Sequence, residues 1–337
     1  MFRPAVRFGT LLTVLAVLAA ACSQTTDQNV VRVYSGRHYD LEQAFTKFSE
    51  ETGISIEFLT GTDSELRERI QAEGSETQAD VYITVDASNL VNAAEAGLFS
   101  PIESPILDAA IPASLKDQDN QWFGLTVRAR TIVYHPDRVM PDEIPSTYEE
   151  LADPHWKGRV CLRNSSNAYT QSLVASLIAN LGREAAFDVV SGWAENAEIM
   201  NNDVLILESI AEGLCDIGIA NHYYLARLVD DDPDFPVKLV WAGQDGNGTH
   251  VNISGGGVTR HADDPDLGQQ LLEWLATDGQ NSFIDNNHEY PANPEVTASG
   301  LLTQQFGTDF VRDQLDASVF GALNADAVRL MDEAGYR

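Results

Sequence analysis

Four tyrosines of this 337-residue chain stand where a β-rich segment runs into an amphipathic, helix-forming segment. They are Tyr39, Tyr169 and the adjacent pair Tyr223 and Tyr224. Open α/β sheets bind ligands at the carboxyl ends of their strands, so these positions predict a shared crevice. A tyrosine hydroxyl has a pKa of about 10 and binds metals poorly until a highly charged cation displaces its proton. Hard oxygen donors favour hard cations, and ferric iron suits a cage of phenolates best.

The adjacent pair Tyr223 and Tyr224 needs a helical backbone if both rings are to reach one ion. Neighbouring side chains on a strand point to opposite faces, whereas in a helix they lie about 100° apart. Asn221 is a favourable N-cap and a helical pattern follows, so we expect the pair in a first turn. The partial positive charge of a helix N-terminus also stabilises a phenolate. A single tyrosine is more typical of a core or surface position, but the set of four favours a metal site.

The N-terminus has the pattern of an export signal. Two arginines precede an apolar stretch at 11–18, which is too short to span a bilayer, and small residues follow at 19–21. Cys22 comes next and leaves two outcomes open: lipidation, which would tether a soluble domain to a membrane face, or simple cleavage and release. We therefore expect an export signal at 1–21, a flexible leader at 22–29 and a periplasmic protein.

The composition limits the partners and raises one covalent question. The formal charge of −30 argues against nucleic acid and anionic lipid as partners. After Cys22 the only cysteines are Cys161 and Cys215, each in an apolar, strand-like run that leads to one of the tyrosine segments. In an oxidising compartment we expect the two to form a disulfide, with two buried free thiols as the alternative.

The order of the elements predicts an α/β fold with two lobes. Strand and helix patterns alternate from 30 to 97, which is typical of parallel strands with helical crossovers. The β-rich run at 122–134 and the glycine-rich run at 250–258 predict two crossovers to a second, similar unit. Two such lobes form a clamp that closes on a ligand. We expect the N-lobe at 30–127, the C-lobe at 128–253, and the second N-lobe segment with C-terminal helices at 254–337.

Three segments resemble a known family. Ser-Gly-Arg-His-Tyr at 35–39, Asn-Ser-Ser-Asn-Ala-Tyr at 164–169 and Ala-Asn-His-Tyr-Tyr-Leu at 220–225 are similar to the periplasmic ferric-iron-binding proteins of ABC transporters. The similarity runs from about residue 30 to the C-terminus. It implies a periplasmic-binding-protein fold of the class II type, whose cleft closes on one Fe(III), and delivery to an ABC permease of the inner membrane. It also implies a carrier rather than an enzyme, and we expect a monomer.

The resemblance also implies a set of iron ligands. These are Tyr39, Tyr169, Tyr223 and Tyr224, with His38 as a further candidate. Another branch of the family uses a glutamate after the third strand together with an external anion, but residues 84–86 are Thr-Val-Asp. The chain therefore resembles the tyrosine-rich branch, in which an arginine beside the ligands offsets phenolate charge. Arg130 is the first candidate for that arginine and Arg37 the second, with an inter-lobe salt bridge as the alternative for Arg130.

Two other classes of protein remain as alternatives. The same fold binds other small solutes, and the loop at 164–167 suits an oxyanion, whereas a polyamine would need carboxylates and aromatic walls. A secreted metalloenzyme usually has two or more histidines at short spacing and an open coordination position. The seven histidines of this chain are scattered and form no such motif. An Fe(III) carrier is therefore the function that the sequence favours.

Overall fold

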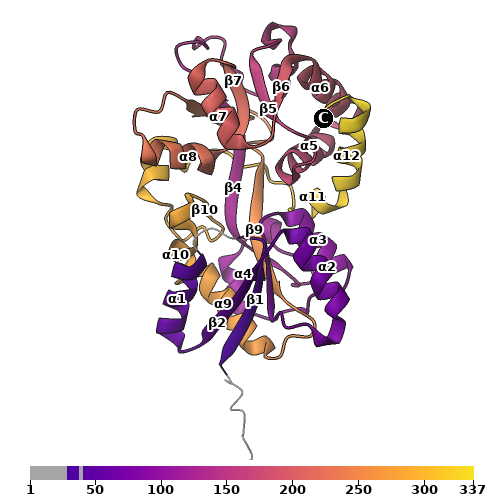
Figure 1. The fold of residues 1–337 in the computed structure, drawn as a ribbon, viewed down its shortest axis with the longest axis vertical. Coiled ribbons are helices and arrows are strands. Elements are labelled where there is room, and N and C mark those ends of the chain that lie inside the picture. The colour runs from indigo at the N-terminus through magenta and orange to yellow at the C-terminus, as the bar shows by residue number, and fades with distance from the viewer. Residues whose placement is uncertain (1–28, 38–40) are drawn as a thin grey trace, which may run out of the picture.

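The structure is a computed structural model that describes residues 29–37 and 41–337. The predicted features that lie outside the described residues are the export signal at 1–21, Cys22, the leader up to residue 28, His38 and Tyr39. The described chain forms two α/β lobes, one above the other in Figure 1, with long strands running between them. The predicted two-lobed α/β class is confirmed.

The first lobe begins with the alternating strands and helices that the sequence predicts. Its first three strands are parallel, with β1 in the middle, and the apolar side chains of β1 and β3 are buried. The helix α1 buries Leu41, Phe45 and Phe48, as its apolar spacing predicts. The elements are β1 (Val30–Ser35), α1 (Leu41–Thr52), β2 (Ser55–Thr60), α2 (Asp63–Glu73), β3 (Val81–Thr84), α3 (Ala87–Glu95) and α4 (Pro105–Ala110).

The second lobe repeats the parallel arrangement around β5, which lies between β6 and β7. The helix predicted at 170–180 is observed as α5, with Leu173 and Val174 buried. The edge strand β6 was not predicted, because its four residues contain no continuous apolar run. The elements are β5 (Val160–Arg163), α5 (Ala168–Leu181), α6 (Arg183–Asn196), β6 (Ala197–Met200), α7 (Asp203–Glu212), β7 (Ile217–Asn221), α8 (His222–Asp231) and β8 (Lys238–Val240).

Two long antiparallel strands, β4 (Phe123–Tyr134) and β9 (Val251–Val258), carry the chain between the lobes. Up to Ala129 the strand β4 pairs with β9, and from Arg130 onward it pairs with β7. One sheet of order β2-β1-β3-β9-β4-β7-β5-β6 therefore continues through both lobes. Gly255 allows this close pairing, because a Cβ there would lie 2.5 Å from a carbonyl oxygen of β4.

The last part of the chain contacts both lobes. After β9 it forms α9 (Pro265–Ala276), α10 (Gln280–Ile284) and the short β10 (Tyr290–Pro291), which pairs with β4. The helix α11 (Ser318–Ala322) contacts α3 and α5, and α12 (Asn324–Glu333) packs on α5 and α6, as the yellow helices of Figure 1 show. Among the described residues, no helix is long and apolar enough to cross a membrane.

Candidate metal centre

Two neighbouring strands of the second lobe position three of the predicted ligands. Tyr169 is the second residue of α5, which follows β5, and Tyr223 and Tyr224 lie in the first turn of α8, which follows β7 directly. Because β5 and β7 are parallel neighbours, both helices begin at the same edge of the sheet. Asn167 caps α5 by accepting a hydrogen bond from the N–H of Tyr169 at 2.9 Å. The expectation that the adjacent pair lies in a first helical turn is confirmed.

The three phenols form one cluster. The ring centroids of Tyr223 and Tyr224 are 4.3 Å apart, and the rings are inclined by 37°. The hydroxyl of Tyr223 accepts a hydrogen bond from Asn221 Nδ2 at 3.3 Å, and the phenols of Tyr169, Tyr223 and Tyr224 are close enough to influence one another's pKa. Asn221 stands at the N-cap position of α8, but its side chain binds Tyr223 and does not cap the helix. The structure thus brings together the three described tyrosines of the predicted set.

Burial keeps two of these phenols protonated at neutral pH. It raises the pKa of Tyr169 to about 12, although the nearby positive charge of Arg128 lowers it. Burial also raises the pKa of Tyr223 well above its usual value, and the neighbouring phenols of Tyr169 and Tyr224 add to this effect. A cation that binds here must therefore displace protons, and this becomes easier as the charge of the cation increases.

Two guanidinium groups lie against the ring of Tyr169. The Cζ atom of Arg128 is 5.2 Å from the ring centroid, and that of Arg163 is 5.3 Å away. Arg163 forms an ion pair with Asp203 at 3.3 Å, whereas buried Arg128 donates to a carbonyl oxygen of β9 at 2.9 Å. Burial alone would lower the pKa of Arg128, but the negative charge available on the nearby phenols outweighs it and raises that pKa. Arg128 therefore stays charged and favours a phenolate at Tyr169.

A third arginine lies over the other two rings. The Cζ atom of Arg227 is 5.3 Å from the ring centroid of Tyr223 and 5.7 Å from that of Tyr224. None of the three arginines around the cluster was predicted from the sequence. The contact of Arg227 could have been predicted, because Arg227 follows Tyr224 by three residues and Tyr223 by four on one helix, and such residues are neighbours on the helix surface. Arg128 lies two residues before Arg130 on the same strand, and local pattern does not distinguish the two.

Arg130, predicted to lie beside the ligands, reaches the cluster only through another residue. Its Nη1 atom pairs with Asp203 at 2.8 Å and donates to Asn221 Oδ1 at 3.1 Å. Asp203 lies at the start of α7 and also accepts from Arg163 and from the N–H of Asn221. This buried network connects β4, β5 and β7 close to the tyrosines. Because Asp203 belongs to the second lobe, like the part of β4 that carries Arg130, the pair is not the inter-lobe salt bridge considered as the alternative.

The first lobe contains a buried charged cluster at Gly36 and Arg37, the last described residues before the remaining predicted ligands in the sequence. Arg37, the second candidate arginine, pairs with Glu289 at 2.5 Å. Gly36 lies against the carboxyl group of Asp63, since a Cβ there would be 1.5 Å from Asp63 Oδ1. Burial, followed by the charge of Asp86, raises the pKa of Asp63 to about 7. One ion pair and one close contact thus hold the two residues that follow β1.

Cys161 and Cys215 form the predicted disulfide, with their Cα atoms 5.8 Å apart. Cys161 lies on β5, and Cys215 lies two residues before β7. The bond therefore ties together the two strands that lead to the tyrosines. With a sequence separation of 54 residues, the restriction of the unfolded chain contributes about 4 kcal/mol to stability.

Other metal-binding side chains offer no competing centre. In the part of the chain that the structure describes, no group of three or more His, Cys, Asp and Glu residues could hold a metal ion. His222, next to the tyrosine pair, is buried and uses both ring nitrogens in hydrogen bonds with backbone groups of Ala129 and His288. Burial lowers its pKa to about 4, so the ring is neutral at pH 7. We find no role for His222 as a ligand.

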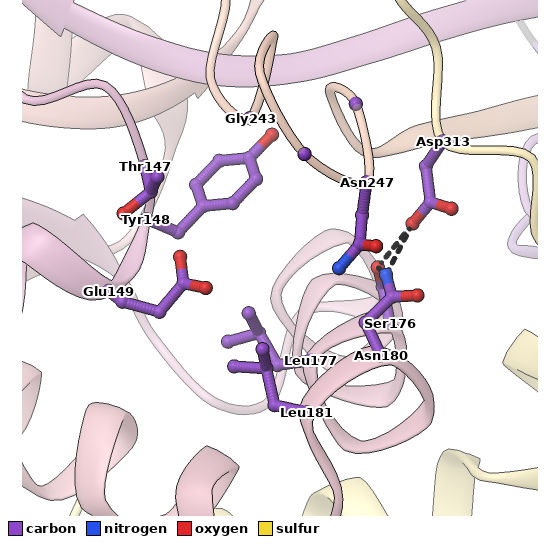
Figure 2. Close-up of a pocket in the computed structure, with 12 residues that line it drawn as sticks. Thr147, Tyr148, Glu149, Ser176, Leu177, Asn180, Leu181, Gly243, Asn247 and Asp313 are labelled. Atoms are coloured by element: carbon purple, nitrogen blue, oxygen red, sulfur yellow. Dashed lines mark hydrogen bonds between the residues drawn. The ribbon is translucent and has the colours of Figure 1, made fainter.

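A cavity of about 110 Å³ lies in the second lobe, between α5 and the loop at 243–248, and Figure 2 shows the residues that line it. None of the three described tyrosine ligands lines it. Its Asp313 already accepts hydrogen bonds from Ser176 and Asn180, both at 2.8 Å. In the Asn-Ser-Ser-Asn loop considered for an oxyanion, the hydroxyl of Ser166 likewise donates within the loop, at 2.9 Å. The tyrosine cluster is the better candidate site.

The chain is similar to known proteins over most of its length. The family described as bacterial extracellular solute-binding protein matches residues 43–307. Iron uptake protein A1 of Synechocystis sp. is 39% identical over 98% of this chain and 96% of its own length. The Fe(3+)-binding periplasmic protein of Serratia marcescens is 27% identical over 94% of this chain and 93% of its own. A Trichodesmium structure named IdiA or FutA, in complex with iron and citrate ligands, superposes with a TM-score of 0.86 at 42% identity, over 91% of this chain and 100% of that one.

Proposed function

The chain belongs to the bacterial extracellular solute-binding protein family, and we propose that it captures Fe(III) between its lobes and delivers it to an ABC permease for iron uptake. Relatives that match nearly the whole chain are named as iron uptake and Fe(3+)-binding proteins. Such relatives support a carrier rather than an enzyme. Within this chain, the observation that carries the proposal is the cluster of Tyr169, Tyr223 and Tyr224 at one edge of the second lobe.

The chain's own residues would hold the cargo as phenolates. The proposed ligands are Tyr39, Tyr169, Tyr223 and Tyr224, with His38 as a further candidate. Four phenolates and one Fe(III) carry a net charge of −1, which the guanidinium groups around the cluster offset. Before iron arrives the phenols hold protons, because burial raises the pKa of Tyr169 and Tyr223. Binding thus exchanges protons for iron, and protonation of the phenols favours release.

Each of the two lobes would provide some of the iron ligands. His38 and Tyr39 follow β1 of the first lobe in the sequence, whereas the described cluster lies in the second lobe, so closure about β4 and β9 would complete the site. As the sequence suggests, we assign residues 30–127 to the first lobe and 128–253 to the second. Residues 254–337 then form the second segment of the first lobe together with the C-terminal helices. The proposed carrier is a periplasmic monomer, exported by the segment at 1–21, with Cys22 as its candidate lipid anchor. The periplasmic name of the Serratia marcescens relative supports this location.

A visible absorption titration with ferric citrate tests the proposal. Tyrosinate bound to Fe(III) gives a charge-transfer band that other cargoes do not give, so the wild-type protein should turn coloured at one iron per chain. Tyr169→Phe and Tyr223→Phe each remove one phenolate without changing the ring and should weaken the band and the retention of iron against citrate. Tyr134→Phe is the matched control, because Tyr134 lies at the far end of β4 and should leave the band unchanged.

Two results would contradict the proposal. A wild-type protein that stays colourless with excess ferric citrate does not bind iron through tyrosinates. A band that is equal in wild type, Tyr169→Phe and Tyr223→Phe would place the iron outside this cluster. Uptake of ⁵⁵Fe in cells that lack the chain, restored by the wild type but not by Tyr223→Phe, separately tests delivery to a permease.

A further inference from the structure

A second pocket, separate from the tyrosine cluster, lies beside β10. Its volume is about 410 Å³, and none of the three described tyrosine ligands lines it. Tyr290 and Pro291 of β10, together with Ala292 and Ala298, give it a buried floor. Its walls are largely apolar and include Pro112, Leu115, Pro294 and Val296. The size is within the range of small-molecule sites, about 300–1,000 Å³.

Arg312 supplies the positive charge of this pocket. Its Cζ atom lies 5.5 Å from the ring centroid of Tyr290 and 5.4 Å from that of Phe310, so two aromatic faces hold the guanidinium in place. Among the residues that the structure describes, this guanidinium has no ion pair and no hydrogen bond. Arg37 and Arg130, by contrast, each bind a buried carboxylate. Burial lowers the pKa of Arg312, which shows that its charge is partly desolvated without a compensating acid.

The rest of the lining suits an anion with an apolar body. The chain carries 51 acidic residues, yet the described residues that line this pocket include no Asp or Glu. Thr297, Thr303 and Thr308 are exposed and line it. The hydroxyl of Thr303 already donates to backbone carbonyl oxygens within its own turn, and that of Thr308 donates to Asp309, so Thr297 is the threonine best suited to donate to an anion. Thr303 lies on a single turn of π-helix, Leu302–Phe306, and such turns occur frequently at functional sites. An uncompensated cation, hydroxyl groups and apolar walls therefore meet in one cavity.

We propose that this pocket binds a small organic carboxylate, with the carboxylate on Arg312 and an apolar or aromatic body against Tyr290 and the prolines. A guanidinium binds a carboxylate through two parallel hydrogen bonds, which fixes the orientation of the acid. An inorganic oxyanion would lose its hydration shell on entering this pocket, and a single cation would not compensate for that desolvation. The pocket would thus bind a second kind of ligand, at a site separate from the iron cluster.

Isothermal titration calorimetry with sodium benzoate tests this proposal on the purified chain. Benzamide has the same ring without the charge and should bind at least about tenfold more weakly, as a charge-assisted hydrogen-bond pair predicts. Arg312→Gln should weaken benzoate binding by a similar factor while leaving the iron charge-transfer band unchanged. Arg260→Gln removes an exposed arginine elsewhere and is the matched control. Arg312→Lys keeps the charge but not the planar pair of donors and should give an intermediate affinity.

Several results would overturn the proposal. One is benzoate binding that is unchanged in Arg312→Gln, which would place the acid elsewhere. Another is equal binding of benzoate and benzamide, which would mean that the pocket recognises only the ring. Binding of sodium phosphate or sulfate but not of benzoate would replace the carboxylate with an inorganic anion. Finally, the proposal would be wrong if benzoate at up to about 10 mM gave no heat of binding, because even a millimolar affinity gives a measurable signal at that concentration. If Arg312→Gln proves unstable, Thr297→Val offers a milder change, and benzoate affinity that did not fall in this variant would also count against the pocket.

Discussion

Replacing Arg128 with glutamine would test whether charge at the tyrosine cluster holds the iron. Arg128 lies 5.2 Å from the ring centroid of Tyr169, is buried and makes its hydrogen bond to a backbone carbonyl rather than to an acid. Its charge acts first on the phenols of Tyr169 and Tyr223 and more weakly on the carboxylates of Glu289 and Asp86. Glutamine removes that charge but keeps an N–H group that can donate to the same carbonyl oxygen, so the change isolates the electrostatic effect.

The size of the effect follows from the change in charge on binding. Four neutral phenols become four phenolates around Fe(III), so the site goes from neutral to a charge of −1. At an effective dielectric constant of about 20, one opposite charge at 5.2 Å contributes about 3 kcal/mol. We expect Arg128→Gln to lose up to about two orders of magnitude in iron affinity. Arg163 is equally close at 5.3 Å, but its ion pair with Asp203 at 3.3 Å offsets part of its charge, so Arg163→Gln should lose less iron affinity than Arg128→Gln.

Competition with citrate at constant pH measures both variants, with the visible band reporting the iron that stays bound. The reasoning requires a larger loss for Arg128→Gln than for Arg163→Gln. If Arg128→Gln retains iron as the wild type does, the charge of Arg128 does not stabilise the bound state. If the two variants lose equally, the ion pair with Asp203 does not reduce the effect of Arg163 on the phenols. Thermal unfolding of the iron-free variants shows whether either change merely destabilises the fold.

Three further predictions concern pH, a buried acid and the disulfide. Because burial raises the pKa of Tyr169 and Tyr223, iron binding must release their protons, and the apparent iron affinity should rise with pH by up to about tenfold per pH unit for each phenol. Titrating the iron-loaded protein with acid at a fixed citrate concentration tests this expectation. Iron retention that does not depend on pH would mean that the phenolates exist before iron binds. The pKa of Asp63 is raised to about 7, so the folded state keeps a proton that the unfolded chain loses near pH 4. The contribution of this proton to the free energy of unfolding is lost as the pH rises through 7, and it is at most about 4 kcal/mol. In urea denaturation, Asp63→Asn should match the wild type at pH 4 and exceed it at pH 8; an equal difference at both values would contradict the shift. Replacing Cys161 and Cys215 together with serine should cost about 4 kcal/mol in the same assay, and a loss below about 1 kcal/mol would show that the bond does not restrict the unfolded chain as its separation predicts.

Local patterns were sufficient for many features of this protein. The apolar periodicity of α1 and the alternation of strands and helices in the first lobe were predicted because each depends on residues within one turn or one strand. The placement of Tyr223 and Tyr224 in a first helical turn was predicted for the same reason. The disulfide between Cys161 and Cys215 followed from having only two candidate cysteines in the exported part of an oxidised protein.

Other features depend on contacts between distant segments. Asn221 is an N-cap residue by type, yet its side chain binds Tyr223 and Arg130, because a buried phenol and a buried guanidinium are stronger partners there than the helix N–H groups. The short β10 has only two residues and exists because it pairs with β4. The pocket at Arg312 likewise arises from segments that are far apart in the sequence, from Pro112 to Arg312.

The sequence by itself determined which residue types stand at the ends of which strands, because strand and helix periodicity and cap residues act locally. It thereby indicated a phenolate site and the cation that suits it. Only the tertiary structure decided which charges surround the phenols. Arg128 and Arg130 share one face of β4, but β4 changes partner between them, from β9 opposite Asn252 to β7 opposite Asn221. Arg128 therefore lies against the ring of Tyr169, and Arg130 binds Asp203. No local pattern encodes this difference, because it depends on pairing between β4 and strands that are some 90 residues or more away in the sequence.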